Sequence, residues 1–427
     1  SRFRFKHAFV ISLYYSQLVP TMGNKPLQTC MYGPESPIPD DEIEDQVGDK
    51  IDPPDLAEGD DDDWVEIKWK YPPPPDLMDP PEQPDEEFPE DEGSYGDTSK
   101  LRSLSDKCTG WASSAKLVKC SNNNPTLFGN INVTDIKQGG IGDCWWIAAI
   151  SGIAERPELV KACFRETDVT SDGVYHVRLF EPTDDYEEVE VEVNDHVPIR
   201  NYYSNSDSCK MPCLAQSLNG ELYTMLLEKA LAKHLGSLSE LSGGWTFLGY
   251  TYLVGCRQHT VISVNGGSLQ HNEVIPEKLG RHSGPQRVLG EIDPDDAWDL
   301  LVQGEQEGAL MCCSWDGAGL EAIADDTGLV SGHAYTMIQA LESPDGFCLM
   351  QCRNPWGSDK EWGKEHPDSC DWCDGSPLWD QYPETAKACG YNGPRPDGIF
   401  WIPWDLFQQY GKSAVISWLP GTGPDEE

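Results

Sequence analysis

The feature that most constrains this chain is an abrupt change of composition about a quarter of the way along its 427 residues. From Gly33 to Lys100 the sequence is dominated by aspartate, glutamate and proline, with aspartate at every position from 60 to 63 and proline at every position from 72 to 75. Such a segment has too little apolar surface to offset the entropy lost on ordering, so we expect it to be disordered. Aromatic, aliphatic and glycine residues return after Leu101, and the folded region is expected to start near Lys107.

The charge and the cysteines restrict partners and location. A formal net charge of -42 argues against binding to nucleic acid or to an anionic membrane, because the summed field repels phosphates. Met22-Gly23 opens like a myristoylation site, but Leu27 stands where serine or threonine is expected, so membrane association is only weakly suggested. The 15 cysteines are odd in number and irregular in spacing, which favours free thiols in a reducing compartment and predicts a cytoplasmic protein.

Hydrophobic periodicity predicts a mixture of helices and strands. An apolar run at 145–153 predicts a buried helix that begins at Cys144 with Asp143 at its cap, and a second helix is expected over 221–235. Period-two alternation at 174–180 and 189–193 predicts a hairpin. After the glycine-rich stretch 242–244, which we expect to be a hinge, a helix is predicted at 295–303, and strands are predicted at 309–315, 333–340, 346–352, 400–404 and 415–419.

The segment from Gln138 to Trp146 contains the first element of a possible thiol chemistry. A cysteine becomes a nucleophilic thiolate near neutral pH when it lies at a helix N-terminus beside an imidazolium. Cys144 meets the first condition, and the glycines before it let the backbone turn closely. Gln138 could aim its side-chain amide at a developing oxyanion together with the Cys144 backbone N–H.

Two later segments supply the partners that such a cysteine needs. In Gly332-His333-Ala334-Tyr335 a histidine opens an apolar strand, so His333 is the candidate general base and acid. In Arg353-Asn354-Pro355-Trp356-Gly357 the Asn354 carboxamide could accept from the imidazole and fix its tautomer. Trp356 would shield that hydrogen bond from water.

These three segments resemble the signature blocks of the calpain family, a branch of the papain-like cysteine peptidases. Asn123 to Phe128, Leu226 to Ala230, Gly236-Ser237, the glycines at 243–244 and Gly398 to Trp401 resemble further family blocks. The resemblance implies an α+β, papain-like two-lobe peptidase, with a helical first lobe carrying the cysteine and a strand-rich second lobe carrying the histidine and asparagine. The expected domains are a disordered N-terminal region at 1–104, a first lobe at 105–244, a second lobe at 245–422 and a tail at 423–427.

The resemblance also implies an activity and a cofactor. It implies a cysteine endopeptidase that makes limited cuts in intracellular proteins, with calcium drawing the two lobes into register. Asp135 and Glu221 fall where the first-lobe calcium carboxylates of the family fall, and Glu361 and Asp397 match the second lobe. Ile399 stands where a further carboxylate is expected, and an apolar side chain cannot ligate calcium, which puts the second site in doubt.

Other functions remain open at this point. A catalytically silent binding module that kept the fold has no chemical need of Cys144, His333, Asn354 and Gln138 together. Another acyl transfer on the same scaffold, such as transglutamination, would incorporate amines without cleaving peptides. His366, Cys370 and Cys373 have spacing that suggests zinc, although they supply three ligands at most and free surface thiols are the simpler alternative.

Overall fold

The structure is a computed structural model that describes residues 76–101, 108–120, 124–182, 186–204, 207–275, 284–316, 327–357, 361–363, 367 and 370–423. Most of the acidic N-terminal segment lies outside these residues, as does the Met22-Gly23 motif. The prediction of disorder before residue 76 therefore concerns residues outside the described part of the chain.

The helices, 3-10 turns included, follow in chain order: α3 (Glu92–Tyr95), η1 (Thr98–Leu101), α4 (Ser114–Cys120), η2 (Val133–Asp135), α5 (Cys144–Ala154), α6 (Pro157–Ala162), α7 (Tyr223–Leu235), η3 (Leu238–Leu241), α8 (Thr246–Val254), α9 (Pro294–Gln306), α11 (Leu378–Gln381), α12 (Pro383–Ala388) and α13 (Trp404–Tyr410). In the described part of the chain, none of them combines the length and apolar character that a bilayer-spanning helix requires.

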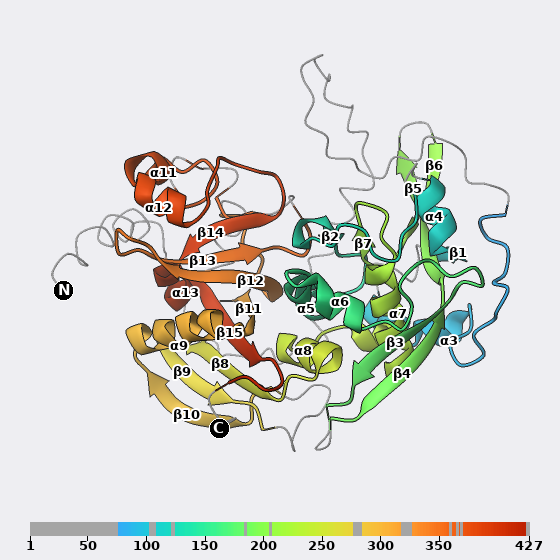
Figure 1. The fold of residues 1–427 in the computed structure, drawn as a ribbon, viewed down its shortest axis with the longest axis horizontal. Coiled ribbons are helices and arrows are strands. Elements are labelled where there is room, and N and C mark those ends of the chain that lie inside the picture. The colour runs from blue at the N-terminus through green and yellow to red at the C-terminus, as the bar shows by residue number, and fades with distance from the viewer. Residues whose placement is uncertain are drawn as a thin grey trace, which may run out of the picture. The chain divides into compact units, whose positions relative to one another are not determined.

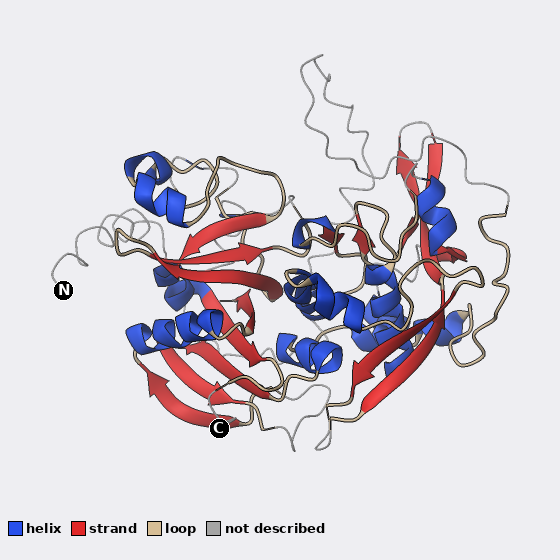
Figure 2. Ribbon diagram, viewed as in Figure 1, coloured by secondary structure: helices blue, strands red, loops and turns tan. Residues whose placement is uncertain are grey.

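The strands are β1 (Cys108–Ser113), β2 (Ile136–Lys137), β3 (Val174–Phe180), β4 (Glu188–Asn194), β5 (His196–Ser204), β6 (Asp207–Pro212), β7 (Gln216–Ser217), β8 (Gln258–Asn265), β9 (Ser268–Glu273), β10 (Arg287–Ile292), β11 (Leu310–Trp315), β12 (His333–Glu342), β13 (Cys348–Arg353), β14 (Ile399–Pro403) and β15 (Gly411–Trp418). Figure 2 shows both helices and strands among the described residues, in agreement with the predicted α+β class.

One large antiparallel sheet contains the C-terminal strands. Within the described residues its strand order is β10-β9-β8-β15-β11-β12-β13-β14. The N-terminal half contributes a smaller sheet of order β1-β5-β6 and two strand pairs, β2-β7 and β3-β4. The predicted hairpin is β3-β4, with Val177 opposite Val191. The strands predicted between 309 and 419 correspond to β11, β12, β13, β14 and β15.

Helix α5 lies where the two halves of the chain meet. It contacts β12 and β11 of the large sheet and also α8 and α6 (Figure 1). Every residue from Trp145 to Ala154 is buried, so the helix is apolar on all sides. Gly152 permits the close approach of α8, because a Cβ at this position would lie 2.2 Å from the Tyr250 hydroxyl oxygen.

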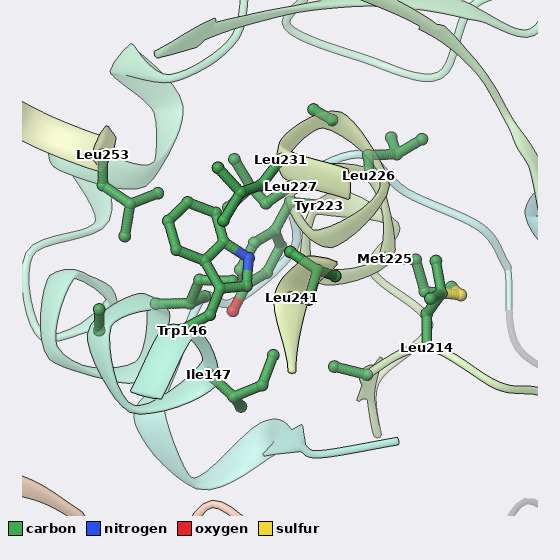
Figure 3. Close-up of a cluster of buried hydrophobic side chains, with 14 of the residues drawn as sticks. Trp146, Ile147, Leu214, Tyr223, Met225, Leu226, Leu227, Leu231, Leu241 and Leu253 are labelled. Atoms are coloured by element: carbon green, nitrogen blue, oxygen red, sulfur yellow. The ribbon is translucent and has the colours of Figure 1, made fainter. Parts of the chain in front are cut away.

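Buried side chains form two large clusters. The first consists mainly of residues from the N-terminal half, and Figure 3 shows Trp146 of α5 in it among Tyr223, Leu227 and Leu231 of α7. The second lies on the large sheet under α9 and α13, where the rings of Trp298 and Trp404 are 5.8 Å apart. Burial of this much apolar surface is the main source of stability for each half.

The structure differs from the sequence expectation over residues 76–101, which we placed in the disordered region. Leu77, Phe88 and Leu101 are buried in the first cluster, and Asp85 forms an ion pair of 2.7 Å with Lys233 of α7. The reason is that a few apolar side chains spaced among the acidic ones are enough to bind this segment to an existing core, which composition alone does not reveal.

Between β13 and β14 the chain makes a long excursion and returns to its starting point. The Asn354 N–H donates to the Gly398 carbonyl over 2.9 Å, so the two ends of the excursion are adjacent. Its described part has a small cluster of its own, in which Trp372, Trp379 and Cys389 pack against Leu349 of β13 and Trp401 of β14.

Candidate active site

Cys144 is the first residue of α5, as predicted. The loop before it is held against the chain at 213–214, since the Gly140 N–H donates to the Cys213 carbonyl over 2.8 Å. Gly139 leaves room for that contact, because a Cβ there would lie 2.2 Å from the same oxygen. Asp143 occupies the N-cap position, but its side chain makes no capping hydrogen bond.

The surroundings of Cys144 favour the protonated form of its thiol. Its side chain is partly exposed. Nevertheless, burial raises its pKa to about 11, an effect that a hydrogen bond from the Ala334 N–H opposes and the charge of Asp143 reinforces. The contact with Ala334 places the sulfur beside the residue that follows His333.

His333 and Asn354 form the hydrogen bond that the sequence predicts. His333 opens β12, Asn354 follows β13, and His333 Nε2 lies 2.9 Å from Asn354 Oδ1. The carboxamide oxygen can only accept, so Nε2 carries the proton in the neutral ring and Nδ1 is left as the basic nitrogen. Burial lowers the pKa of His333 to about 4, and the hydrogen bond that His333 donates to Asn354 partly offsets this effect.

Aromatic rings enclose the imidazole. The Trp356 ring lies over the His333 ring with centroids 4.3 Å apart, and Tyr335 meets it edge-on at 5.1 Å. The Trp356 N–H also donates to Asn354 Oδ1 over 2.9 Å. Trp356 therefore lies where the sequence analysis expects it, beside both members of the pair.

Contacts between the two halves hold the cysteine near the histidine. Thr336 Oγ1 of β12 donates to the Ala148 carbonyl of α5 over 2.9 Å. The Gln138 N–H donates to the Pro355 carbonyl, also over 2.9 Å. The buried Arg353 guanidinium donates to the Ile136 carbonyl and, over 3.3 Å each, to the Thr134 carbonyl and the Ser151 hydroxyl.

Gln138 is near the cysteine, but its amide is engaged within its own loop. Nε2 donates to the Ile141 carbonyl over 2.8 Å and to Asp143 Oδ1 over 3.3 Å. The other end of the amide, Oε1, is buried and makes no hydrogen bond with any described residue. An amide in this orientation must turn before it can serve an oxyanion.

A pair of buried carboxyl groups behind Cys144 escaped the sequence analysis. Glu228 of α7 is fully buried and accepts from the Ala215 N–H over 2.6 Å. Burial raises the pKa of Asp143 to about 7, and a hydrogen bond with Glu228 opposes that rise. Burial and the charge of Asp143 raise the pKa of Glu228. A hydrogen bond between two carboxyl groups forms only while one of them holds a proton. The periodicity of α7 indicated only that Glu228 lies on a helix.

The acidic residues predicted to bind calcium lie in two places. Burial raises the pKa of Asp135 to about 6, and repulsion from Glu221 adds to this rise. Glu221 is fully buried and already accepts from the Gly129 N–H and the Ser217 hydroxyl. Asp135 accepts from the Asn219 amide over 2.6 Å.

The second acidic group surrounds Gly398. Glu361 Oε1 accepts from the Gly398 N–H over 2.6 Å, and Asp397 Oδ1 accepts from the Ile399 N–H over 2.9 Å. Asp374, which sequence reasoning missed, adds a carboxyl group whose pKa is raised to about 6 by burial and further by the charge of Asp397. Among the described residues, no set of three or more acidic, histidine or cysteine side chains is arranged to hold a metal ion.

The suspected zinc cluster is incomplete in the described chain. His366 lies outside the described residues. Cys370 and Cys373 are buried rather than on the surface, so the alternative of free surface thiols was wrong. They fill space beside the aromatic cluster of the excursion, where Gly363 leaves no room for a Cβ.

The fold and the site together define the core of a papain-like cysteine peptidase. Comparison with known proteins gives the family: residues 84–417 match the model described as calpain family cysteine protease. This chain therefore belongs to the calpain family of cysteine proteases.

Several curated calpains are similar to the chain. Calpain-type cysteine protease DEK1 of Arabidopsis thaliana is 28% identical over 338 residues, covering 78% of this chain and 14% of that protein. DEK1 of Zea mays is 30% identical over 295 residues, with coverages of 68% and 12%. The calpain-2 catalytic subunit of Gallus gallus is 28% identical over 324 residues, with coverages of 73% and 39%. The chain thus spans well under half the length of each of these relatives.

Proposed function

We propose that this chain is a calcium-dependent cysteine endopeptidase that makes limited cuts in intracellular proteins. The observation that carries the proposal is the His333–Asn354 hydrogen bond of 2.9 Å, formed beside the helix that begins with Cys144. A histidine oriented by an acceptor and next to a thiol at a helix start is the arrangement that nucleophilic acyl transfer needs.

The proposed reaction assigns a role to each of these residues. His333 Nδ1 takes the proton of Cys144, and the thiolate attacks the carbonyl carbon of a peptide bond. The Cys144 N–H and the Gln138 amide stabilise the oxyanion. His333 then protonates the leaving amine, and water hydrolyses the acyl-enzyme. Trp356 keeps water away from the hydrogen bond that fixes the imidazole tautomer.

The electrostatics support a resting form that must be activated. With the pKa of Cys144 raised to about 11 and that of His333 lowered to about 4, both groups are neutral at pH 7. The thiolate–imidazolium pair requires the two side chains to approach each other, and Gln138 must leave the Ile141 carbonyl. Activation by movement of the two halves would supply both changes.

Calcium is the proposed activator. The donor set at the first site fits a cation, because Asp135 and Glu221 are both carboxylates and their mutual repulsion adds to the raised pKa of Asp135. Bound calcium would supply positive charge that draws these carboxylates and their segments together. Glu361 and Asp397 are the proposed ligands of the second site, where Ile399 supplies no carboxylate.

Buried cysteines such as Cys163, Cys256 and Cys312 are free thiols, which supports the further proposal of a reducing, cytoplasmic location.

The test is casein cleavage by the purified chain with calcium and with a chelator. We expect cleavage only with calcium, and none by the Cys144→Ala variant. Cys348→Ala, which removes another partly exposed thiol far along the sequence, is the matched control and should cleave as the parent does. Cleavage that survives Cys144→Ala would overturn the assignment of the nucleophile. Calcium-independent cleavage would overturn the proposed activation by calcium. Amine incorporation without cleavage would favour transglutamination.

A further inference from the structure

Two cysteines that the proposed reaction does not use lie in close contact. Cys108 Sγ and Cys213 Sγ are 3.0 Å apart although the residues are separated by 105 positions in the sequence. Cys108 begins β1 and Cys213 follows β6, and these strands flank β5 in the small sheet. A disulfide has an S–S distance of about 2.05 Å, so the sulfurs need to approach by only about 1 Å to form one.

The two thiols differ in their surroundings. Cys108 is partly exposed and Cys213 is buried. Hydrogen bonds from Cys213 and the Tyr95 hydroxyl lower the pKa of Cys108, assisted by the charge of Arg200. The same hydrogen bond, together with burial, raises the pKa of Cys213. One sulfur is therefore an accessible, thiolate-forming atom, and the other is a protonated neighbour within bonding reach.

We propose that Cys108 and Cys213 form a reversible disulfide in response to hydroperoxides, with Cys108 as the reacting thiol and Cys213 as the resolving thiol. The Cys108 thiolate attacks an oxygen of hydrogen peroxide, the O–O bond breaks, and a sulfenic acid and hydroxide result. Cys213 then attacks the sulfenic sulfur, the S–O bond breaks, and the S–S bond forms. In total, two thiols and one hydrogen peroxide give one disulfide and two waters.

Other neighbouring cysteines provide a contrast. Cys313 Sγ and Cys352 Sγ are 3.6 Å apart, but both side chains are buried in the core of the large sheet. Peroxide has no route to either sulfur in the folded protein. The Cys313–Cys352 pair is therefore an internal control that shows whether peroxide cross-links Cys108 and Cys213 selectively.

The position of Cys213 links the disulfide to the proposed active site, and this part of the inference rests on the proposed function. The Cys213 carbonyl accepts from Gly140, and Gly139 packs against the same oxygen. A shift of Cys213 toward Cys108 moves this anchor, and with it the loop that carries Gln138. Oxidation is therefore expected to lower the rate of peptide cleavage.

The chemical test uses the full chain with Cys144→Ala, so that the active-site thiol cannot react. After treatment with hydrogen peroxide and alkylation, non-reducing peptide mapping should show one cross-link, between Cys108 and Cys213, that dithiothreitol reverses. Two titratable thiols should be lost, and the Tm should rise by several degrees because the cross-link closes a long loop. A control with Cys213→Ser should stop at a sulfenic acid on Cys108, which dimedone traps.

The outcomes separate this inference from the proposed function. Absence of the 108–213 cross-link, or equal cross-linking of Cys313 and Cys352, would overturn the disulfide. In the chain with Cys144 intact, peroxide should cause a loss of activity that dithiothreitol restores, and Cys213→Ser should lose less in the same treatment. Equal losses of activity in the parent and in Cys213→Ser would overturn the proposed link between the disulfide and the loop that carries Gln138. A chain that forms the cross-link but never cleaves casein would leave the disulfide standing and remove the proposed function.

Discussion

Asp143 occupies the cap position of α5, yet its carboxyl group is hydrogen-bonded to Glu228 rather than to the helix backbone. The two groups connect the helix that carries Cys144 with α7, and Asp143 also receives the Gln138 amide. A shared proton between the two carboxyl groups therefore helps to fix the loop on which the proposed oxyanion donor lies. Proton loss from this pair should loosen the loop and lower stability.

We predict that Glu228→Gln changes how stability depends on pH. The folded-state pKa of Asp143, about 7, is above the value of about 3.9 for an unfolded aspartate. The folded state binds more protons between these values, so this pair's stabilisation is present at low pH and is lost as pH rises toward and through 7. An amide at 228 has no titrating proton and can donate to ionised Asp143 at every pH, so the variant should lose less of this stabilisation as pH rises.

The measurement is Tm from pH 5 to 8 in the Cys144→Ala background, which prevents self-digestion. The Tm of Glu228→Gln relative to its parent should increase with pH. Glu291→Gln, at an exposed position on β10, should follow the parent at every pH. Parallel curves for all three proteins would contradict the shared proton.

The sequence was informative about single residues where chemistry depends on residue type and order. His333, Asn354 and Trp356 lie together as their local motifs predicted, and Cys144 begins α5. The Asp143–Glu228 bond was not predictable, because it joins residues whose neighbourhoods in the sequence carry no shared pattern. The orientation of the Gln138 amide was equally hidden, since it depends on where the Ile141 carbonyl and Asp143 lie in space.

At the scale of elements, β13 is the strand that connects the large sheet to the N-terminal half. Its last residue, Arg353, is fully buried and donates to carbonyls on η2 and β2 and to a hydroxyl on α5. These acceptors have little access to water, so the guanidinium replaces their hydration. The same charge opposes the rise in the pKa of Asp135 that burial causes.

We predict that Arg353→Met destabilises the protein by roughly 3 kcal/mol or more, because it leaves buried acceptors unpaired. The control is Arg287→Met, which removes a half-exposed ion pair with Glu273 between β10 and β9 and should cost about 1 kcal/mol or less. Urea unfolding of both variants measures the difference. Equal costs would show that the Arg353 contacts do not hold the two halves together.

Elements with regular periodicity were predictable, and those with interrupted periodicity were not. The hairpin β3-β4 and helices α5 and α7 formed within a few residues of their predicted ranges. Strand β10 was missed, and the structure gives the reason: its register shifts between Val288 and Gly290, and Val288 and Leu289 are exposed at 64% and 50%. Alternation of apolar and polar residues cannot indicate a strand whose apolar side chains face solvent.

For the whole molecule, the segment 76–101 extends the folded unit beyond the start that composition suggested. Phe88 is buried and meets the Trp111 ring edge-on with centroids 6.3 Å apart. Asp85 pairs with Lys233, and the Asp97 N–H donates to the Ser239 hydroxyl over 3.0 Å. These contacts tie the end of the acidic region to α7 and η3.

We predict that Phe88→Ala lowers the free energy of unfolding by roughly 3 kcal/mol or more, as large-to-small changes in a core do. Met78→Ala in the same segment is the control, since Met78 is 46% exposed and its truncation should cost about 1 kcal/mol or less. Thermal or urea unfolding in the Cys144→Ala background gives both values. A small cost for Phe88→Ala would mean that the segment is not part of the folded core in solution.

The excursion between β13 and β14 has a consequence for how such proteins diverge. Because Asn354 and Gly398 are hydrogen-bonded neighbours, the chain leaves and re-enters the sheet at one place. Insertions or deletions between them that spare Trp356, Glu361 and Asp397 leave the strand register, and the histidine–asparagine pair, unaltered. Over evolutionary time the rest of this segment can change its length and surface, so lineages can acquire new docking or regulatory features here without rebuilding the catalytic framework.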